Sequence, residues 1–230
     1  TYVYGNVLLE ADGEGNSQII HYGGDSGNQQ RYRKGTLYLY HNTIVSTRSG
    51  NTTLVRMPTN DESCLAINNI IHVTAAGPQL ALMSTSGGVM TLERNVMKSG
   101  WVQAHGTASG TVNALNNIYT TTPGFSSLAA EDFDLINGSV CIDSATTLPT
   151  ALQTQYLPVA EYVKHSQSRI KPAHGMPDIG AYEYESPTGI LDVPIAPELE
   201  LHVTPTIARG IVSIRHSNAN TITVYSALGT

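Results

Sequence analysis

The feature that most constrains the fold is a short unit that ends on asparagine and occurs five times along the chain. The copies generally carry apolar residues three and five positions before the asparagine and a mostly apolar pair directly after it. The anchoring residues are Asn6, Asn42, Asn69, Asn95 and Asn117. They lie 36, 27, 26 and 22 residues apart. A period in the twenties is typical of a solenoid, in which each repeat adds one coil to a stack.

Each unit predicts two strands that meet at a corner. Alternation before the asparagine indicates a strand with one face inward, and the apolar pair after it starts a strand in a new direction. Asparagine tolerates the left-handed backbone of a tight bend, and its amide can bond the same side chain in the next coil. A third strand is expected between corners, at residues 17–22, 52–57, 79–83 and 101–104. Ordinary hairpin turns are the competing interpretation, but they would favour Asn-Gly without a fixed return of flanking residues.

Composition excludes several classes of function. Only 13% of residues are charged, and the formal net charge is −6 with scattered Lys and Arg, which argues against a nucleic-acid groove. The sequence has no apolar run near the about 20 residues that a membrane-spanning helix needs. Cys64 and Cys141 lie among apolar residues, and buried thiols are expected in preference to a disulfide bridge or metal ligands. The chain begins at Thr1 inside a repeat, so we expect a piece of a longer protein.

The asparagine units, of which LYLYHNTIV is the clearest, resemble the coils of right-handed parallel β-helix proteins of the pectate-lyase-like kind. The later motifs D-F-D-L, G-S-x-x-I-D and D-I-G-A-x-E resemble the closing region of secreted β-helix proteins. The resemblance covers about residues 1–185. It implies an all-β, right-handed parallel β-helix, a three-sheet solenoid finished by that closing region. Asp143 and Asp178 within these motifs are interpreted as turn-capping carboxylates in preference to a metal or catalytic pair.

The rest of the chain divides into a linker and a tail. Residues 186–197 carry three prolines and are interpreted as a linker. Residues 198–230, with V-T-P-T-I-A-R-G at 203–210, resemble the front half of the C-terminal sorting domain of type IX secretion in Bacteroidetes. A partial β-sandwich-like tail is expected, with strands near Leu201, 211–215 and 221–225, too short for an independent domain. The resemblance implies a secreted or cell-surface protein that uses export machinery as a partner.

Proteins of the resembled family often act on acidic polysaccharides, so the resemblance implies polysaccharide as the main partner. Glycan recognition with lyase-like ancestry is the favoured hypothesis. An active lyase that cleaves an acidic glycan by β-elimination, or a non-catalytic structural or adhesive surface protein, is the alternative. Elimination needs a group that neutralises the uronate carboxylate, a base and a proton donor. No cofactor is expected, except calcium if the protein is a lyase. Hydrolysis would need paired carboxylates, and no outward stack of them is present in the sequence.

Outward polar residues on adjacent coils would form columns with a spacing of about 4.8 Å. One expected column contains His21 and Arg56, followed by Leu82 and Gln103. A second contains His41, Asn68, Arg94 and Asn116, with Lys98 four residues beyond Arg94. The weak catalytic candidates are therefore His21, Arg56, Arg94 and Lys98. The competing interpretation of both columns is a solvated sheet face.

Tyrosines recur at matching positions of the first two coils. Tyr2 and Tyr38 share one register, and Tyr4 and Tyr40 share another. Aromatic ladders stabilise sheets, and an exposed pair could also stack on a sugar ring. The weak substrate-binding candidates are Tyr2, Tyr38, Tyr40 and His41.

Overall fold

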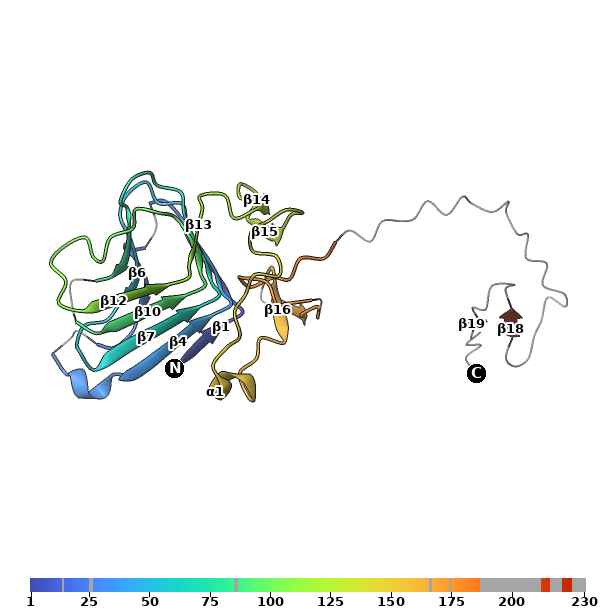
Figure 1. Ribbon diagram of the computed structural model, residues 1–230, viewed down its shortest axis with the longest axis horizontal. Helices are drawn as coiled ribbons and strands as arrows, with labels where there is room; N and C mark the ends of the chain where they lie inside the picture. Colours follow the sequence, from blue (N-terminus) through green and yellow to red (C-terminus); the bar gives the residue numbers. More distant parts are fainter. Residues whose placement is uncertain are drawn as a thin grey trace. The chain divides into compact units, whose positions relative to one another are not determined.

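The computed structural model describes residues 1–13, 15–24, 27–84, 87–165, 167–173 and 175–186, and the backbone of two strands at 212–215 and 221–224. The chain divides into two compact units, Thr1–Pro187 and Thr188–Thr230. Strands dominate the described part of the first unit (Figure 1). The described helices are two short turns, η1 (Gln29–Arg31) and α1 (Thr150–Gln153).

Three parallel sheets form the larger part of the first unit. Sheet A runs in the order β1 (Tyr2–Tyr4), β4 (Gly35–Tyr40), β7 (Glu62–Ile67), β10 (Val89–Glu93) and β12 (Thr111–Leu115). Sheet B runs in the order β2 (Val7–Glu10), β5 (Thr43–Ser46), β8 (Ile70–Val73), β11 (Val96–Met97) and β13 (Ile118–Tyr119). Sheet C contains β3 (Gln18–His21), β6 (Thr52–Arg56) and β9 (Leu80–Met83). The strand expected at 101–104 is reduced to one parallel bridge between Ala81 and Val102. Each sheet follows the order of the sequence, an arrangement compatible with a parallel β-helix.

The five anchor asparagines form a hydrogen-bonded ladder at the corner between sheets A and B. The backbone N–H and Nδ2 of each of the first four anchors donate to Oδ1 of the next, at 2.8–3.1 Å. Asn42, Asn69 and Asn95 are fully buried. A buried amide is stable only when its polar atoms are paired, and the ladder provides that pairing.

The left-handed backbone lies one residue earlier than the sequence indicated. Positive φ is found at the residue before each anchor, namely Gly5, His41, Asn68, Arg94 and Asn116. Expecting this conformation at the anchors themselves was wrong. The physical reason is the second bond of the amide: Asn42 Nδ2 also donates to Tyr40 O at 3.0 Å, and Asn69 Nδ2 donates to Ile67 O at 3.1 Å. The bend must therefore lie on the residue between the carbonyl and the anchor.

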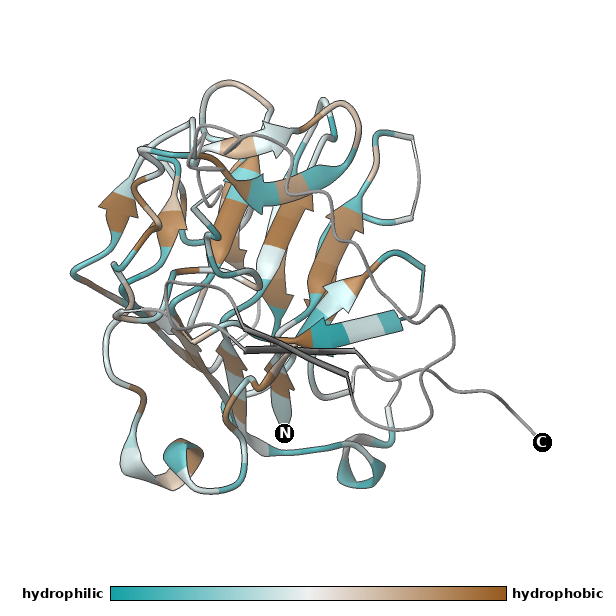
Figure 2. Ribbon diagram, turned by 90° about the vertical axis from the view of Figure 1, so that its right-hand side faces the viewer, coloured by the Kyte–Doolittle hydropathy of each residue, from teal (hydrophilic) through white to brown (hydrophobic). Residues whose placement is uncertain are grey.

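Apolar side chains fill the interior of the stack. Inward positions in register, such as Leu37, Cys64 and Met90, contact one another through successive coils. Figure 2 shows the strands of the stack as largely hydrophobic. Cys64 and Cys141 are both buried and free. Burial raises the pKa of each thiol to about 12, so both remain protonated at neutral pH.

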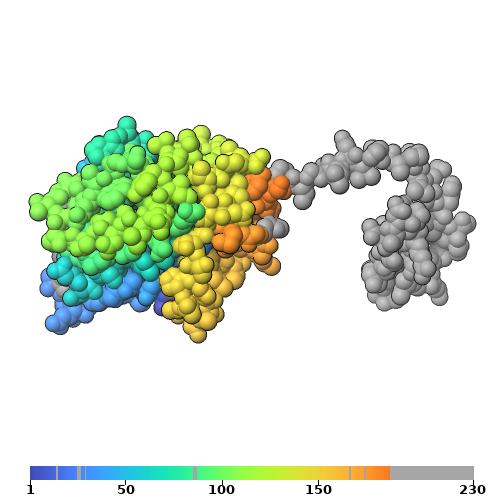
Figure 3. Space-filling model, viewed as in Figure 1, coloured from blue at the N-terminus to red at the C-terminus, as the bar shows by residue number. Residues whose placement is uncertain are grey.

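After β13 the chain leaves the coils and forms a closing segment, residues 121–186. It contains the hairpins β14 (Phe125–Ser127) with β15 (Asp132–Leu135) and β16 (Ala160–Val163) with β17 (Gln167–Ile170). The segment packs against the stack (Figure 3), where the Phe125 ring meets His72 of β8 edge-on at 5.7 Å. Ile179 packs with Ile70 of β8 and Val96 of β11. The closing segment thus covers the outer face of sheet B.

The second unit is described only as one antiparallel pair, β18 (Val212–Arg215) with β19 (Thr221–Val224). The strand expected near Leu201, the V-T-P-T-I-A-R-G motif and the linker after Ser186 lie outside the described residues. In the part of the chain that the structure describes, no helix is long and apolar enough to cross a membrane.

Candidate functional site

The residues directly before the anchors form a polar corner column. Its members are His41, Asn68, Arg94 and Asn116. Positive φ at each of them turns the side chain away from the interior of the coil. The sequence indicated this column, but the competing interpretation of a solvated face does not hold for its first two members, because His41 and Asn68 are buried.

Two members of the corner column hold the closing segment through its main chain. Asn68 Oδ1 accepts from Thr146 N at 2.9 Å, and Asn68 Nδ2 donates to Thr146 O at 2.8 Å. The Asn68 side-chain amide therefore pairs with both backbone polar groups of Thr146, as a neighbouring strand would. Arg94 Nε donates to Ser144 O at 2.6 Å. The backbone at 144–146 is fixed along the corner by these bonds.

His41 binds the same segment as a neutral imidazole. Its Nε2 lies 3.2 Å from Asn68 Nδ2, which can only donate, so Nδ1 carries the proton and donates to Asp178 O at 3.1 Å. Burial and the charge of Lys171 lower the pKa of His41 to about 3. Both ring nitrogens are occupied, and the ring is buried. His41 is thus a structural contact in this structure and does not present a surface to a glycan.

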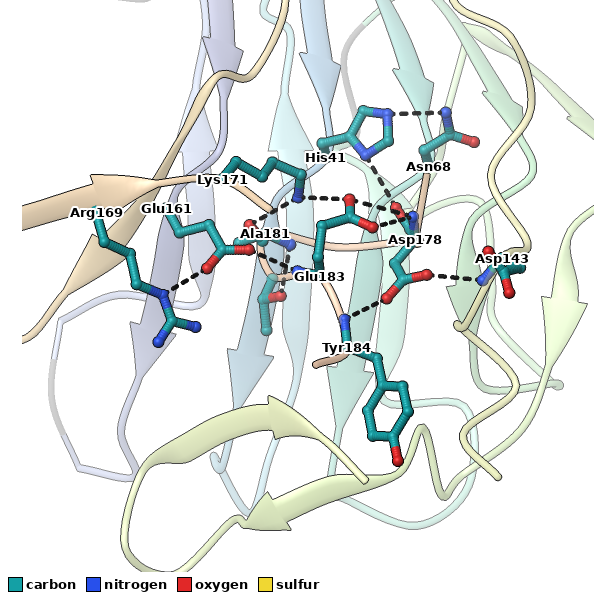
Figure 4. A network of polar contacts seen from close by, with 11 residues as sticks. His41, Asn68, Asp143, Glu161, Arg169, Lys171, Asp178, Ala181, Glu183 and Tyr184 are labelled. Atoms are coloured by element: carbon teal, nitrogen blue, oxygen red, sulfur yellow. Dashed lines mark hydrogen bonds and ion pairs between the residues drawn. The ribbon is translucent and has the colours of Figure 1, made fainter. Parts of the chain in front are cut away.

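Asp178 caps turns of the closing segment (Figure 4). Its Oδ1 accepts from Asp143 N at 2.7 Å and its Oδ2 accepts from Tyr184 N at 2.5 Å. Asp143 Oδ1 in turn accepts from Met176 N at 3.0 Å. Burial raises the pKa of Asp178, while these backbone donors act in the opposite direction. Both carboxylates thus bind backbone N–H groups across the closing segment.

An ionic network with buried carboxylates continues from Asp178 and reaches the exposed Arg169 (Figure 4). Glu183 accepts from Asp178 N at 3.1 Å and forms an ion pair with Lys171 at 3.0 Å. Glu161 accepts from Glu183 N at 2.6 Å and from Arg169 Nε at 2.7 Å. Burial raises the pKa of Glu183, which Lys171 opposes. Sequence reasoning missed Glu161 and Lys171, because residues 144–177 have no repeat and these two carry no motif.

Two hollows flank the backbone strap at 145–147. The first is a mainly apolar groove of about 790 Å³ between the strap and residues 157–159, 170–173 and 175–177, with His41, Lys171 and Glu183 in its walls. The second, the corner hollow, has a volume of about 570 Å³ and mostly polar walls. It is lined by Glu93, Arg94, Asn116, Asn117, Ala145, Thr146, Thr147 and Met176. Both volumes are in the range of small-ligand sites.

The corner hollow contains two members of the corner column, Arg94 and Asn116, whose side chains keep polar groups without a bond to any described residue. Arg94 is oriented through Nε, which leaves the two Nη groups of its guanidinium without a bond to any described residue. No hydrogen bond within the described residues engages the exposed Asn116 amide. Thr147 is exposed at the rim, and Glu93 adds a carboxylate. This set of charged, amide and hydroxyl groups can bind a polyhydroxylated or carboxylated ligand.

The other predicted column is only partly assembled. His21 is exposed and lies in register with Arg56 on the neighbouring coil. The sequence indicated that Leu82 would continue this column, and that prediction is wrong. Leu82 is fully buried, and the pairing of Val55 with Met83 shows that it lies beside Leu54. The stretch LALM is apolar at every position, so its alternation could not fix the register.

Lys98 lies apart from Arg94 and from both hollows. Its side chain is buried, and its Nζ donates to Ala75 O. Lys98 also contributes to a lowered pKa of His72, after burial as the main cause. The ammonium is therefore enclosed beside sheet B, which is a poor position for a base that must reach a polysaccharide.

The tyrosines pack as rings. Tyr2 stacks on Tyr38 with centroids 5.2 Å apart and on Tyr156 of the closing segment at 4.0 Å. Tyr4 stacks on Tyr40 at 5.0 Å. Tyr40 is fully buried and donates its hydroxyl to Tyr156 O at 2.6 Å. Tyr40 therefore offers no open face to a sugar, and the ring stack joins the first coils to the closing segment.

Comparisons with protein-family models, with curated proteins and with solved structures found no match to this chain. Among the residues that the structure describes, no group of three or more His, Cys, Asp or Glu side chains is arranged to hold a metal ion.

Proposed function

We propose that this chain belongs to an exported, right-handed parallel β-helix protein that recognises polysaccharide and has lyase-like ancestry. Three parallel sheets in sequence order and the asparagine corner support the pectate-lyase-like relationship. The resemblance of residues 198–230 to a type IX sorting domain supports export and a cell-surface or secreted location. The protein binds its glycan at the corner hollow.

The observation that carries this assignment is the pair of side chains left over at the end of the corner column. Arg94 is held by Ser144 O with its guanidinium directed by that bond, and Asn116 follows on the next coil. A guanidinium with a fixed orientation binds a carboxylate or sugar hydroxyl with little loss of side-chain entropy. The threonine side chains of the strap add further hydrogen-bonding groups.

Recognition is favoured over catalysis by the state of the candidate groups. Elimination needs a base and a proton donor in addition to a group that neutralises the carboxylate. Glu93 and Arg94 are the ionisable side chains among the residues that line the corner hollow. Lys98 is enclosed on Ala75 O, and both nitrogens of His41 are occupied. A lyase would therefore need groups that the described residues do not bring to this hollow.

The test is the affinity of the purified chain for alginate, pectate, glycosaminoglycans and neutral glucans. The variant Asn116→Asp keeps the size of the side chain and adds one negative charge to the hollow. We expect it to weaken binding of an acidic glycan by roughly fivefold, since one exposed charge at contact distance contributes about 1 kcal/mol. The matched control is Asn137→Asp, at an exposed position outside both hollows, and it should bind like the wild type.

Two results would contradict the proposal. One is the absence of binding to every glycan tested, which would favour a structural or adhesive role. The other is release of an unsaturated product, measured by its ultraviolet absorbance, which would show an active lyase.

A further inference from the structure

The outer edge of β12 is an open strand edge at the end of sheet A. β12 pairs with β10, and within the described part of the chain no strand pairs with its other edge (Figure 1). The two strands are in register, but their burial differs. Leu92 of β10 is fully buried, whereas its partner Ala114 is exposed. An inward-facing position of β12 is therefore exposed at the open end of the last coil.

Other residues at this end of the stack also lack the contacts that a further coil would provide. Leu115 and Tyr119 remain 49% and 50% exposed. The backbone N–H of Asn95 donates to the Asn117 side chain, but no described asparagine accepts from the N–H of Asn117. The described closing segment covers sheet B and the first members of the corner column, and no backbone hydrogen bond of the described residues joins it to the open edge of β12.

The β12 edge lacks the usual protection against pairing. Its sequence, Thr-Val-Asn-Ala-Leu, has no charged residue and no proline, and at five residues it is as long as β10. Exposed edge strands of monomeric proteins usually carry charges, prolines or bulges that prevent association. The uncharged edge is suited to a partner that is itself a strand.

The backbone polarity of β12 specifies which partner fits. Thr111 N donates to Gly88 O and Leu115 O accepts from Arg94 N, so residues 111, 113 and 115 direct their polar groups to β10. Because these directions alternate along a strand, the N–H and C=O groups of Val112 and Ala114 point to the open side. Two donors and two acceptors placed symmetrically about Asn113 match their own copy in an antiparallel arrangement.

We propose that a second copy of this chain binds here, with the two β12 strands antiparallel about a two-fold axis at Asn113. Val112 then exchanges both backbone hydrogen bonds with the partner's Ala114, and the reverse pair does the same. Val112 and Ala114 lie on the inward face of sheet A, so their side chains join the apolar interiors of the two stacks. This self-complementary contact is the isologous type found in two-fold dimers.

A charge at the two-fold position tests this geometry directly. In Asn113→Lys or Asn113→Asp, two like charges meet across the axis, and each variant should dimerise at least about tenfold more weakly than the wild type. An equimolar mixture of the two variants should restore dimers, because opposite charges then meet. Sedimentation velocity over a wide range of protein concentration measures all four samples.

The matched control is Thr91→Lys, on β10 in register with Asn113 and one coil farther from the axis. It should dimerise like the wild type. A second variant, Ala114→Pro, removes a donor that no described group uses, and it should also weaken the dimer. A wild-type chain that stays monomeric at every concentration overturns the proposal. So does a dimer that is unaffected by either charge at Asn113.

Discussion

Replacement of Asn69 by alanine is the sharpest test of the asparagine ladder. Asn69 is the central anchor and is fully buried. Its Oδ1 accepts from the backbone N and Nδ2 of Asn42, at 3.0 and 2.9 Å. Its Nδ2 donates to Leu39 O at 2.8 Å and to Asn95 Oδ1 at 2.8 Å. The substitution removes all of these bonds at once.

The expected magnitude follows from the groups that lose their partners. The Asn42 N–H is left unpaired, because no second acceptor lies within reach in the ladder. Leu39 O loses the Asn69 amide but keeps its backbone donor in the parallel pairing of β4 with β7. Leaving one buried donor or acceptor unpaired costs about 1–3 kcal/mol. The unpaired donor at about 2 kcal/mol and the lost bonds from Asn69 Nδ2 to Leu39 O and to Asn95 Oδ1 at about 1 kcal/mol each give a loss of about 4 kcal/mol. This is a large share of the roughly 5–15 kcal/mol that stabilises a typical domain.

Urea unfolding followed by far-ultraviolet circular dichroism measures this loss. Two controls separate the ladder from a general effect of removing an amide. Asn117→Ala, at the partly buried end of the ladder, should lose about 1–2 kcal/mol, because it has neighbours on one side only. Asn51→Ala, in an exposed loop, should change stability by about 0.5 kcal/mol or less. Equal losses at Asn69 and Asn117 would refute the reasoning.

Three further predictions concern the closing segment. Burial and the charge of Lys171 lower the pKa of His41 from about 6.5 in the unfolded chain to about 3, so its contribution to stability is present above pH 6.5 and declines as pH falls. The stability advantage of wild type over His41→Asn should shrink by about 2 kcal/mol from pH 7 to pH 5 in urea titrations. Lys171→Met should cost about 3–5 kcal/mol by leaving Glu183 buried without its cation, and adding Glu183→Gln should recover part of the loss in thermal unfolding. If the stability losses of Lys171→Met and Glu183→Gln simply added in the double variant, the Lys171–Glu183 ion pair would be contradicted. Gly180→Ala should increase proteolysis within residues 144–186, because its Cβ would lie 2.7 Å from Ile70 Cδ1 at a φ of +109°. Unchanged cleavage would contradict that packing.

The repeating part of the fold was accessible from sequence because each coil meets the same physical demand. Residues three before the anchor, such as Leu39, Ala66 and Leu92, all face inward, and the anchor amide must find a partner above and below. The same residue pattern therefore indicates the same local structure in each of these coils. The exact bend was not accessible, because asparagine and its neighbour both tolerate positive φ, as Asn68 followed by Asn69 shows.

The closing segment was much harder to anticipate. Its motifs located Asp178 and Glu183, but their partner Lys171 lies in a stretch without periodicity. Polar residues of the corner column suggested an exposed site, yet nothing in the sequence shows that Thr146 covers Asn68. Contacts between segments 78 residues apart depend on how the chain returns, and the local pattern does not encode that return.

The stacking of coils itself can be tested by one crosslink. Thr36 and Ser63 are in register on β4 and β7, with their hydroxyl oxygens 2.9 Å apart. Cysteines at both positions should form a disulfide on mild oxidation, since paired positions on adjacent strands fall within the about 4.4–6.8 Å Cα separation that a disulfide requires. Peptide mapping without reductant should show the 36–63 link in high yield. Equal or preferred linkage of Thr36→Cys with Leu65→Cys, two residues out of register, would contradict the stack of parallel coils.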